Sequence, residues 1–421
     1  MRTSHRKFLL NMTRYSFIIF LAATVVSACA EPITLDRVHT LPATEQVAWG
    51  NYLERSRSNA VADAAAVQAE VAALKRTNAL KAPSGGDYKL KFEPGNVWFA
   101  SDEAKQLADA VLSYQTPSGG WSKHIGFTKG PRKPGMQWTS QNEPGQPAHY
   151  VATFDNGSTT GEIRLLAGVW LATEREDCRA AVIKGLHFIV AAQFPNGGWP
   201  QVYPLEGGYH DDITFNDDAM THVLELLQAI AIREPAYAML SDAERQQAEG
   251  ALAHGIQCVL KMQVMQAGKR TVWCAQNDAL TLQPANARKM EPATLSGLES
   301  AHILKFLMTI SRPSAEIVDT ITNGLQWFEA VKIAGDTRPN ASGKKYFEPD
   351  SKGTQIRWAR FYNLTNNQPV FPGRDGVIYN SFAEMAAHNK LGYDYFSSQP
   401  GSIVNNGQKK WRKQQAKTSG K

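Results

Sequence analysis

The chain has 421 residues, of which 43% are hydrophobic and 10% aromatic, and its formal net charge is +6. This composition excludes a largely disordered chain and allows a sizeable core. The mildly positive charge is compatible with an acidic partner, but no basic run interleaved with aromatic residues supports nucleic acid. We therefore expect a folded protein that binds no nucleic acid.

Residues 1–30 have the pattern of an export signal. Four basic side chains precede an apolar run at residues 15–26: Arg2, Arg6, Lys7 and Arg14. Residues 26–29 fit a lipobox, in which Cys29 would carry a lipid, and residues 28–30 fit an ordinary cleavage site; we favour the lipobox slightly. We expect an exported protein, either secreted, periplasmic or an outer-membrane lipoprotein. No later stretch is long and apolar enough to span a bilayer, so a lipid at Cys29 would be its membrane anchor.

Residues 31–90 predict a helical N-terminal extension followed by a linker. Apolar side chains recur at helical spacing from Ala64 to Leu74, and Pro83 to Gly86 form a turn-rich segment. The main domain is expected at 91–398, with a helix starting at Ser101. The tail at 399–421 is rich in lysine, and we expect it to be disordered and solvated.

Three helical hairpins are predicted within the main domain. The first helix of each hairpin follows residue 159, residue 216 or residue 296, and the three partner helices carry apolar residues at 182–190, 252–260 and 317–325. Capping boxes are predicted at Thr159 with Glu162, at Ser241 with Glu244, and at Ser296 with Glu299. Helical hairpins bury their apolar faces by packing side by side.

A weak internal repeat supports this arrangement. The segment from Gln115 to Trp121 is echoed from Gln193 to Trp199, and each copy follows a predicted helix. We predict a mainly α fold, an (α/α)3 barrel or partial toroid of three helical hairpins. Its other half would be irregular and loop-rich, with short strands, at 122–155, 264–295 and 335–385.

The three cysteines that remain after the signal have no metal-ligand spacing. Cys178, Cys258 and Cys274 are an odd number, and we expect them to be buried or singly bridged rather than catalytic.

Polar segments precede the first helix of every hairpin, at 153–160, 214–218 and 283–291. If these helices line one side of the ring, the segments meet at one rim and form a cleft. Asp217 and Thr221 are four residues apart, so they would share one face at a helix start, where the helix dipole keeps a carboxylate ionised. Position alone favours helix capping for Asp155, Asp217 and Asp218; only their coincidence favours a hard cation.

Arginines form a second constellation. Arg288 stands in the polar segment 283–291, the pair Arg357 and Arg360 in the segment 356–362, and Arg374 in the turn 372–376. Guanidinium groups bind carboxylates through two parallel hydrogen bonds. A single arginine is more often a surface residue. Arg374 fits an ordinary turn beside Asp375, and one of Arg357 and Arg360 is expected to be structural.

Several long segments together resemble one known family. They lie in order between about residues 95 and 395, at 153–160, 194–201, 213–220, 272–276, 291–292, 357–362 and 371–376. These segments resemble the family 10 polysaccharide lyases, which are helical pectate lyases. The fold of that family, a partial (α/α) barrel with an irregular half, is the fold that the hairpins predict.

The resemblance implies a pectate lyase that cleaves α-1,4-polygalacturonate by calcium-assisted anti β-elimination, giving unsaturated oligogalacturonides. It implies that Arg288 is the catalytic base, that Asp155, Asn156, Thr221, Arg360 and Arg374 bind substrate, and that Asp217 and Asp155 bind Ca²⁺. Calcium suits an oxygen-rich site that substrate carboxylates complete. Because an arginine is protonated in ordinary settings, activity should rise towards alkaline pH. We expect a monomer.

Three other functions are compatible with parts of the sequence. A glycoside hydrolase on a helical scaffold would use two carboxylates, such as Asp155 and Asp217, and would give no unsaturated product. A terpene-cyclase-like protein shares the Gly-Gly-Trp and Asp-Asp patterns, but an export signal disfavours it. A non-catalytic, pectin-binding lipoprotein would bind galacturonan without turnover.

Overall fold

The computed structural model describes residues 32–85, 95–141, 148–339, 345–389 and 393–419. The predicted signal at 1–30 and the lipobox Cys29 lie outside the described residues. The described chain is mainly helical and carries short strands. None of its described helices is long and apolar enough to cross a membrane.

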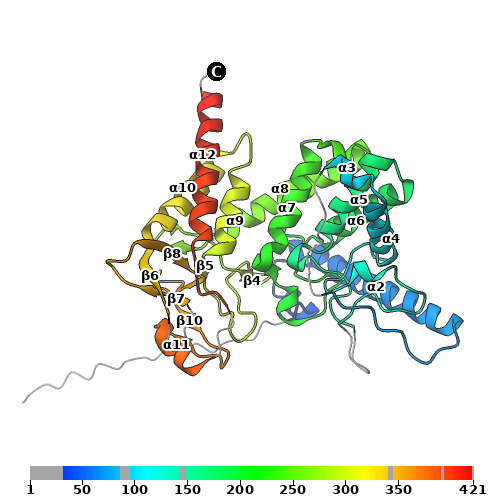
Figure 1. Ribbon diagram of the computed structural model, residues 1–421, viewed down its shortest axis with the longest axis horizontal. Helices are drawn as coiled ribbons and strands as arrows, with labels where there is room; N and C mark the ends of the chain where they lie inside the picture. Colours follow the sequence, from blue (N-terminus) through cyan, green and yellow to red (C-terminus); the bar gives the residue numbers. More distant parts are fainter. Residues whose placement is uncertain (1–31, 86–94, 142–147, 340–344, 390–392, 420–421) are drawn as a thin grey trace, which may run out of the picture.

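Three helical hairpins form the centre of the molecule, as the apolar periodicity predicts. The hairpins pair α5 (Thr160–Thr173) with α6 (Glu176–Ala192), α7 (Ala219–Ala231) with α8 (Asp242–Met262), and α9 (Leu298–Leu307) with α10 (Ala315–Ala330). Helix α7 contacts both α5 and α9, and α8 contacts both α6 and α10. The hairpins therefore pack side by side, as Figure 1 shows. Their first helices, α5, α7 and α9, form one layer, here called the inner helices, and α6, α8 and α10 form the other, the outer helices.

Four buried tryptophans repeat one contact along this array. The indole N–H of Trp121 donates to the carbonyl of Val111, 2.8 Å away, near the end of α4 (Asp102–Ser113). Three further indoles bond in the same way to the last turns of α6, α8 and α10: Trp199 to Ile189, Trp273 to Val259, and Trp358 to Phe328. Each bond brings a donor to a carbonyl in the last turn of a helix, where intrahelical donors run out, although Val111 O also accepts from Tyr114 N at 3.1 Å. The repeat seen in the sequence at 115–121 and 193–199 therefore has four structural copies.

A glutamine precedes three of these tryptophans, and in each copy its side-chain amide donates to two backbone carbonyls. The side-chain amide of Gln115 donates to Gly119 O and to Ala181 O of α6, at 2.9 and 3.0 Å. Gln193 joins Gly197 O to Ala251 O of α8, and Gln263 joins Thr271 O to Thr320 O of α10. These amides tie each loop to the following outer helix, which fixes the spacing of the hairpins.

The described part of the C-terminal tail, residues 399–419, is a helix, so the disorder expected there is wrong. Helix α12 (Gln399–Ser419) contacts α9 and β8 (Gln355–Ala359) (Figure 1). Gly401 packs against the Trp358 ring and Gly407 against Met308, positions at which a Cβ atom would approach within about 2.5 Å. Burial of Val404 and the lack of a side chain at these glycines let a basic helix dock.

The N-terminal extension packs directly on the hairpins. It contains the short helix α1 (Leu35–Val38) and the long helix α2 (Ala43–Ala73). Tyr52 of α2 donates to Ala192 O at the end of α6, and Asp63 accepts from both the amide and the hydroxyl of Ser118 at 2.7 Å. Trp49 and Tyr52 belong to the same hydrophobic core as the hairpins. The extension and the hairpins thus share one core.

Short strands and turns complete the irregular part of the fold. A four-stranded antiparallel sheet has the order β12-β8-β6-β7, with β6 at Ile333–Pro339, β7 at Lys345–Pro349 and β12 at Phe396–Ser397. Two-residue strands form four further pairs: β1 (Ile213–Thr214) with β4 (Gln276–Asn277), β2 (Met265–Gln266) with β3 (Lys269–Arg270), β5 (Leu295–Ser296) with β9 (Phe361–Tyr362), and β10 (Phe371–Pro372) with β11 (Ile378–Tyr379). The short helices α3 (Asn96–Phe99) and α11 (Phe382–His388) flank α4 and the β10–β11 pair.

One of the three predicted capping boxes is correct. Ser241 and Glu244 satisfy each other's backbone amides at the start of α8. Thr159 instead has a φ of 62° and accepts from Trp121 N, so its side chain caps no helix. Ser296 donates to the Glu299 carboxylate, but α9 begins at Leu298 without a side-chain cap.

Cys178, Cys258 and Cys274 are buried and free, which agrees with the structural role expected of them.

Candidate active site

Two turns of matching conformation place the predicted carboxylates. Residues 155–157 and 216–218 each form a single 3-10 turn before an inner helix, and the two turns contact each other. Asn156 has φ 55° and ψ 26°, and Asp217 has φ 51° and ψ 28°. Asn and Asp enter this left-handed region more readily than other side chains, because their short polar groups bond locally.

The turn at 216–218 corrects the predicted relation between Asp217 and Thr221. Because Asp217 precedes α7 and lies outside helical geometry, the two residues do not share a helix face. Thr221 is buried in the first turn of α7, and its hydroxyl has no hydrogen-bond partner among the described residues. It is not among the side chains that line the cavity described below.

Asp155 is buried beside a lysine. Its carboxylate forms an ion pair with Lys123 and accepts a hydrogen bond of 3.2 Å from the Asn156 amide. The ammonium of Lys123 lies 4.0 Å from the centre of the Tyr150 ring. A buried carboxylate requires such a partner, because an uncompensated charge is costly away from water. Asp155 therefore belongs to a charged cluster rather than to a simple helix cap.

Asp217 faces a cavity of about 430 Å³ between the inner-helix starts. Asn156, Asp217, Glu299 and Arg360 line this cavity, together with residues of α12. Although its side chain is open to the cavity, desolvation by the surrounding protein, followed by the charges of Asp155 and Glu299, raises the pKa of Asp217 to about 6. Arg360 and Lys123 oppose this shift. A carboxylate among like charges gains most from an added cation.

Arg360 lies at the centre of the cluster. Its Nη2 is 3.3 Å from Asn216 Oδ1 and 3.7 Å from the Glu299 carboxylate. Its guanidinium carbon lies 4.2 Å from the centre of the Tyr393 ring. Arg357, by contrast, stacks over Phe347 and bonds within the four-stranded sheet, to Thr337 and Gln355. Of this pair, Arg360 lines the cavity, whereas Arg357 is bonded into the sheet, which favours a structural role for Arg357.

Arg288 is joined to the cluster through Tyr393. Its Nε and Nη2 donate to the two oxygens of Glu291, at 2.8 and 2.6 Å, and Nη2 also donates to the Tyr393 hydroxyl at 3.0 Å. That hydroxyl donates in turn to Glu291, at 2.5 Å. The hydrogen bonds to Glu291 raise the pKa of Arg288 above its already high value. In this arrangement Arg288 is held as a cation.

Arg374 stands at the edge of the same region, in the turn between β10 and β11. It is exposed, and its guanidinium has no carboxylate partner in the described part of the chain. Burial raises the pKa of Tyr395, and the charges of Arg360 and Arg374 both oppose this shift, so both guanidinium groups lie near that tyrosine. A Cβ atom on Gly376, in the same turn, would lie 3.8 Å from Lys289. The turn therefore lies next to the Arg288 segment.

The structure thus gathers most of the predicted site. Asn156, Asp217 and Arg360 line one cavity, Asp155 is an electrostatic neighbour of Asp217, and Arg288 and Arg374 are linked to it through Tyr393 and Tyr395. No motif in the sequence identified Lys123, Tyr393 or His302. The sequence indicated Asp218 and Glu299 only as helix-capping candidates, and the structure places the side chains of Asp218 and His302 2.7 Å apart. Lys123 lies two residues after the repeat at 115–121, and the equivalent residue after the second copy is Gln201. This difference between the two copies is the signal in the sequence that could have indicated a special role for Lys123.

The donor set fits a hard cation only in part. Asp217 and Asp155 offer carboxylate oxygens and Asn156 an amide oxygen, which are the ligand types that calcium prefers. Within the described residues, no three His, Cys, Asp or Glu side chains converge closely enough to hold a metal ion. An ion here would need oxygens from a bound molecule, which is the incomplete protein coordination that the sequence predicts.

Comparisons with known proteins identify one family. The family model for pectic acid lyase matches residues 115–404. A family 10 polysaccharide lyase from Cellvibrio cellulosa is 33% identical, with a TM-score of 0.63, and the match covers 76% of this chain and 98% of that one. An aspartate-to-alanine variant of such an enzyme from the same organism, in complex with trigalacturonic acid, is 34% identical, with a TM-score of 0.64 and coverage of 75% and 95%. No curated protein matches the chain.

Proposed function

The chain belongs to the pectic acid lyase family, and from that premise we propose that it cleaves α-1,4-polygalacturonate by calcium-assisted anti β-elimination, with Arg288 as the base. It is a polysaccharide lyase. The observation that carries the proposal is the meeting of Asn156, Asp217 and Arg360 in one cavity, with Arg288 one tyrosine away. The two-layered hairpins support a partial (α/α)3 barrel for the scaffold.

The reaction breaks two bonds and forms one double bond. A base removes the C5 proton of a uronate, the electron pair forms the C4–C5 double bond, and the C4–O bond breaks. The leaving sugar keeps the oxygen with that bond's electron pair, and the oxygen takes a proton from solvent water to become a hydroxyl group. The developing charge is enolate-like and lies on the uronate carboxylate. Preorganised cations around that carboxylate stabilise it, which is usually the largest catalytic contribution. Arg360 and Arg374 supply such cations.

Arg288 has to lose a proton before it can accept one. Its hydrogen bonds with Glu291 oppose this, because they raise its pKa. Tyr393 already donates to Glu291, so that carboxylate keeps a partner when the guanidinium turns towards substrate. Arg360 lies against the same tyrosine, and a second cation favours the neutral form of Arg288. Activity rising towards alkaline pH follows from this requirement.

Calcium is the cation that this site would take. Asp217 and Asp155 would hold it, with Asn156 beside them, and the substrate carboxylates would complete the coordination. When bound, the ion would neutralise the uronate carboxylate and so make the C5 proton more acidic. Desolvation, followed by the charges of Asp155 and Glu299, raises the pKa of Asp217, and this supports the assignment because an added cation would favour the ionised carboxylate. Asn156, Thr221, Arg360 and Arg374 would bind substrate.

An ultraviolet assay on polygalacturonate tests the proposal. The wild type should release an absorbing unsaturated uronide, and a calcium chelator should abolish the signal. Arg288→Ala should lose roughly a hundredfold or more of kcat, the usual contribution of a general base, while retaining much of its binding. Arg312→Ala is the matched control, because it removes an exposed arginine from the connection between α9 and α10. Hydrolysis without absorbance would identify a glycosidase, and binding without any product would identify a binding protein.

We also infer from residues 1–30 that the protein is exported, as a secreted or periplasmic protein or as an outer-membrane lipoprotein with a lipid on Cys29. We further propose that it acts as a monomer. Mass spectrometry of the mature N-terminus tests the lipid, and light scattering tests the monomer. An unmodified N-terminus beyond Cys29 would exclude the anchor.

A further inference from the structure

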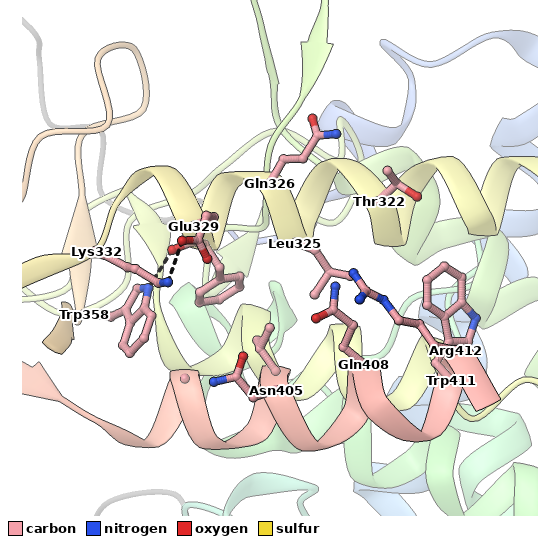
Figure 2. Close-up of a pocket in the computed structure, with 13 residues that line it drawn as sticks. Thr322, Leu325, Gln326, Glu329, Lys332, Trp358, Asn405, Gln408, Trp411 and Arg412 are labelled. Atoms are coloured by element: carbon pink, nitrogen blue, oxygen red, sulfur yellow. Dashed lines mark hydrogen bonds and ion pairs between the residues drawn. The ribbon is translucent and has the colours of Figure 1, made fainter. Parts of the chain in front are cut away.

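A second groove lies between α10 and α12, away from the inner-helix starts. It has a volume of about 460 Å³ and a mixed polar and aromatic lining. Figure 2 shows Gln408, Trp411 and Arg412 of α12 extending into the space between the two helices. Leu325 and Gln326 of α10 form part of the opposite wall. The groove is therefore built from an outer helix and the C-terminal helix.

The groove carries hydrogen-bonding groups without protein partners. The side chains of Gln326, Asn405 and Gln408 make no hydrogen bond to other described residues, although all three line the groove. The indole nitrogen of Trp411 is buried and has no hydrogen-bond partner in the described chain. Amides both donate and accept, which suits hydroxyl groups, and an indole offers a flat apolar face with one N–H. This combination is suited to a sugar.

The charge of the groove favours an acidic sugar. The segment 399–421 contains no Asp or Glu, and Arg412 is an exposed groove residue without a carboxylate partner among the described residues. The acidic groove residue, Glu329, is already paired with Lys332 at 2.6 Å. An unpaired guanidinium binds a carboxylate through parallel hydrogen bonds. A neutral polysaccharide would leave that group unused.

A third cavity borders both the groove and the active site. This cavity, of about 490 Å³, shares Trp358 with the groove and shares Arg360 and Gln399 with the catalytic cavity. The first turn of α12 also serves both sites, since Ser402 lines the catalytic cavity and Gly401 lines the groove. The two sites therefore lie close enough for one long polymer chain to contact both.

We propose that the α10–α12 groove is a secondary binding site for the galacturonate chain of the substrate. It holds a distant part of the polymer while another part occupies the active site. This inference rests on the proposed substrate, and it concerns residues outside the family match, since Asn405, Gln408, Trp411 and Arg412 follow its end at 404. Two linked contacts bind a long chain more tightly than either contact alone, whereas a short oligomer gains nothing.

The test compares long polygalacturonate with trigalacturonate as substrates. Arg412→Gln should raise KM for the long polymer roughly tenfold, which corresponds to about 1.4 kcal/mol, and leave KM for trigalacturonate unchanged. Trp411→Ala should do the same. Lys410→Gln is the matched control, because it removes an exposed charge from the same helix outside the groove. Circular dichroism confirms that each variant is folded, and Arg412→Gln, which changes an exposed side chain, stays informative if Trp411→Ala unfolds.

Two results would overturn the inference. One is an unchanged KM for the long polymer in both groove variants; the other is an equal rise in KM for both substrates, which would place the effect in the active site. Failure of the proposed function is distinguishable, since the wild type would then release no unsaturated product from either substrate.

Discussion

Replacing Glu291 with Gln tests how the protein controls its base. Glu291 accepts two hydrogen bonds from Arg288, and these raise the pKa of the guanidinium. A charge-assisted hydrogen bond contributes about 1.5–3 kcal/mol in favourable settings. The Arg288 side chain is 52% exposed, so solvent screening reduces the pair to about 1–1.5 kcal/mol. Since one pKa unit corresponds to about 1.4 kcal/mol, Glu291→Gln should lower the pKa of Arg288 by about one unit.

The assay is the pH dependence of kcat/KM, followed by the ultraviolet absorbance of the unsaturated product. The rising alkaline limb should move about one pH unit towards neutrality in Glu291→Gln, because the neutral guanidine becomes accessible at lower pH. Glu176→Gln is the matched control, since it breaks another pair of Arg and Glu three residues apart, with Arg179 on α6. A lower rate with an unshifted pH profile would refute the reasoning and would assign Glu291 a purely positional role.

Three further predictions concern the metal, the pH dependence of stability and the repeat. The calcium concentration needed for half-maximal activity should rise as pH falls below about 6, because protonated Asp217 cannot ligate the ion. Asp217→Asn should remove this pH dependence, and a calcium requirement of the wild type that does not change with pH would contradict the assignment. Burial raises the pKa of Glu162 to about 8, so the stability contributed by its neutral form is present at acidic pH and is lost as pH rises towards and through 8. Glu162→Gln should therefore raise the free energy of unfolding by about 2 kcal/mol or more at pH 9. A variant whose free energy of unfolding is lower than that of the wild type by the same amount at every pH would exclude this cause. Trp273→Phe removes the bond to Val259 O and should cost about 1–3 kcal/mol in urea unfolding, whereas a neutral effect would show that the repeated indole contact does not stabilise the array.

Helix periodicity was sufficient to predict the hairpins, but not their full repeat. The third copy, Gln263 to Trp273, escapes notice because the β2–β3 pair is inserted between the two residues. The C-terminal helix was missed because its lysines suggest solvation, although Val404, Gln408 and Trp411 recur at helical spacing. Its docking depends on close approach at Gly401 and Gly407, a tertiary property that no local pattern reveals.

The sequence predicts the site residues that stand in segments resembling the family, but not the residues that join the site through contacts with distant parts of the chain. Asp155, Asp217 and Arg360 stand in long matching segments, so resemblance placed them together. Lys123 and Tyr393 act through partners 32 and 105 residues away, Asp155 and Arg288, and no spacing connects such pairs. Local spacing likewise does not predict the left-handed backbone of Asp217. This residue lies in one of two 3-10 turns that contact each other, and so it does not share a helix face with Thr221.

A crystal structure of Arg288→Ala with calcium and trigalacturonate tests the central claim most directly. The account predicts one ion between Asp217, Asp155 and a uronate carboxylate, with a second carboxylate on Arg360 and the C5 carbon facing position 288. A sugar bound elsewhere, or an ion remote from Asp217, would contradict it.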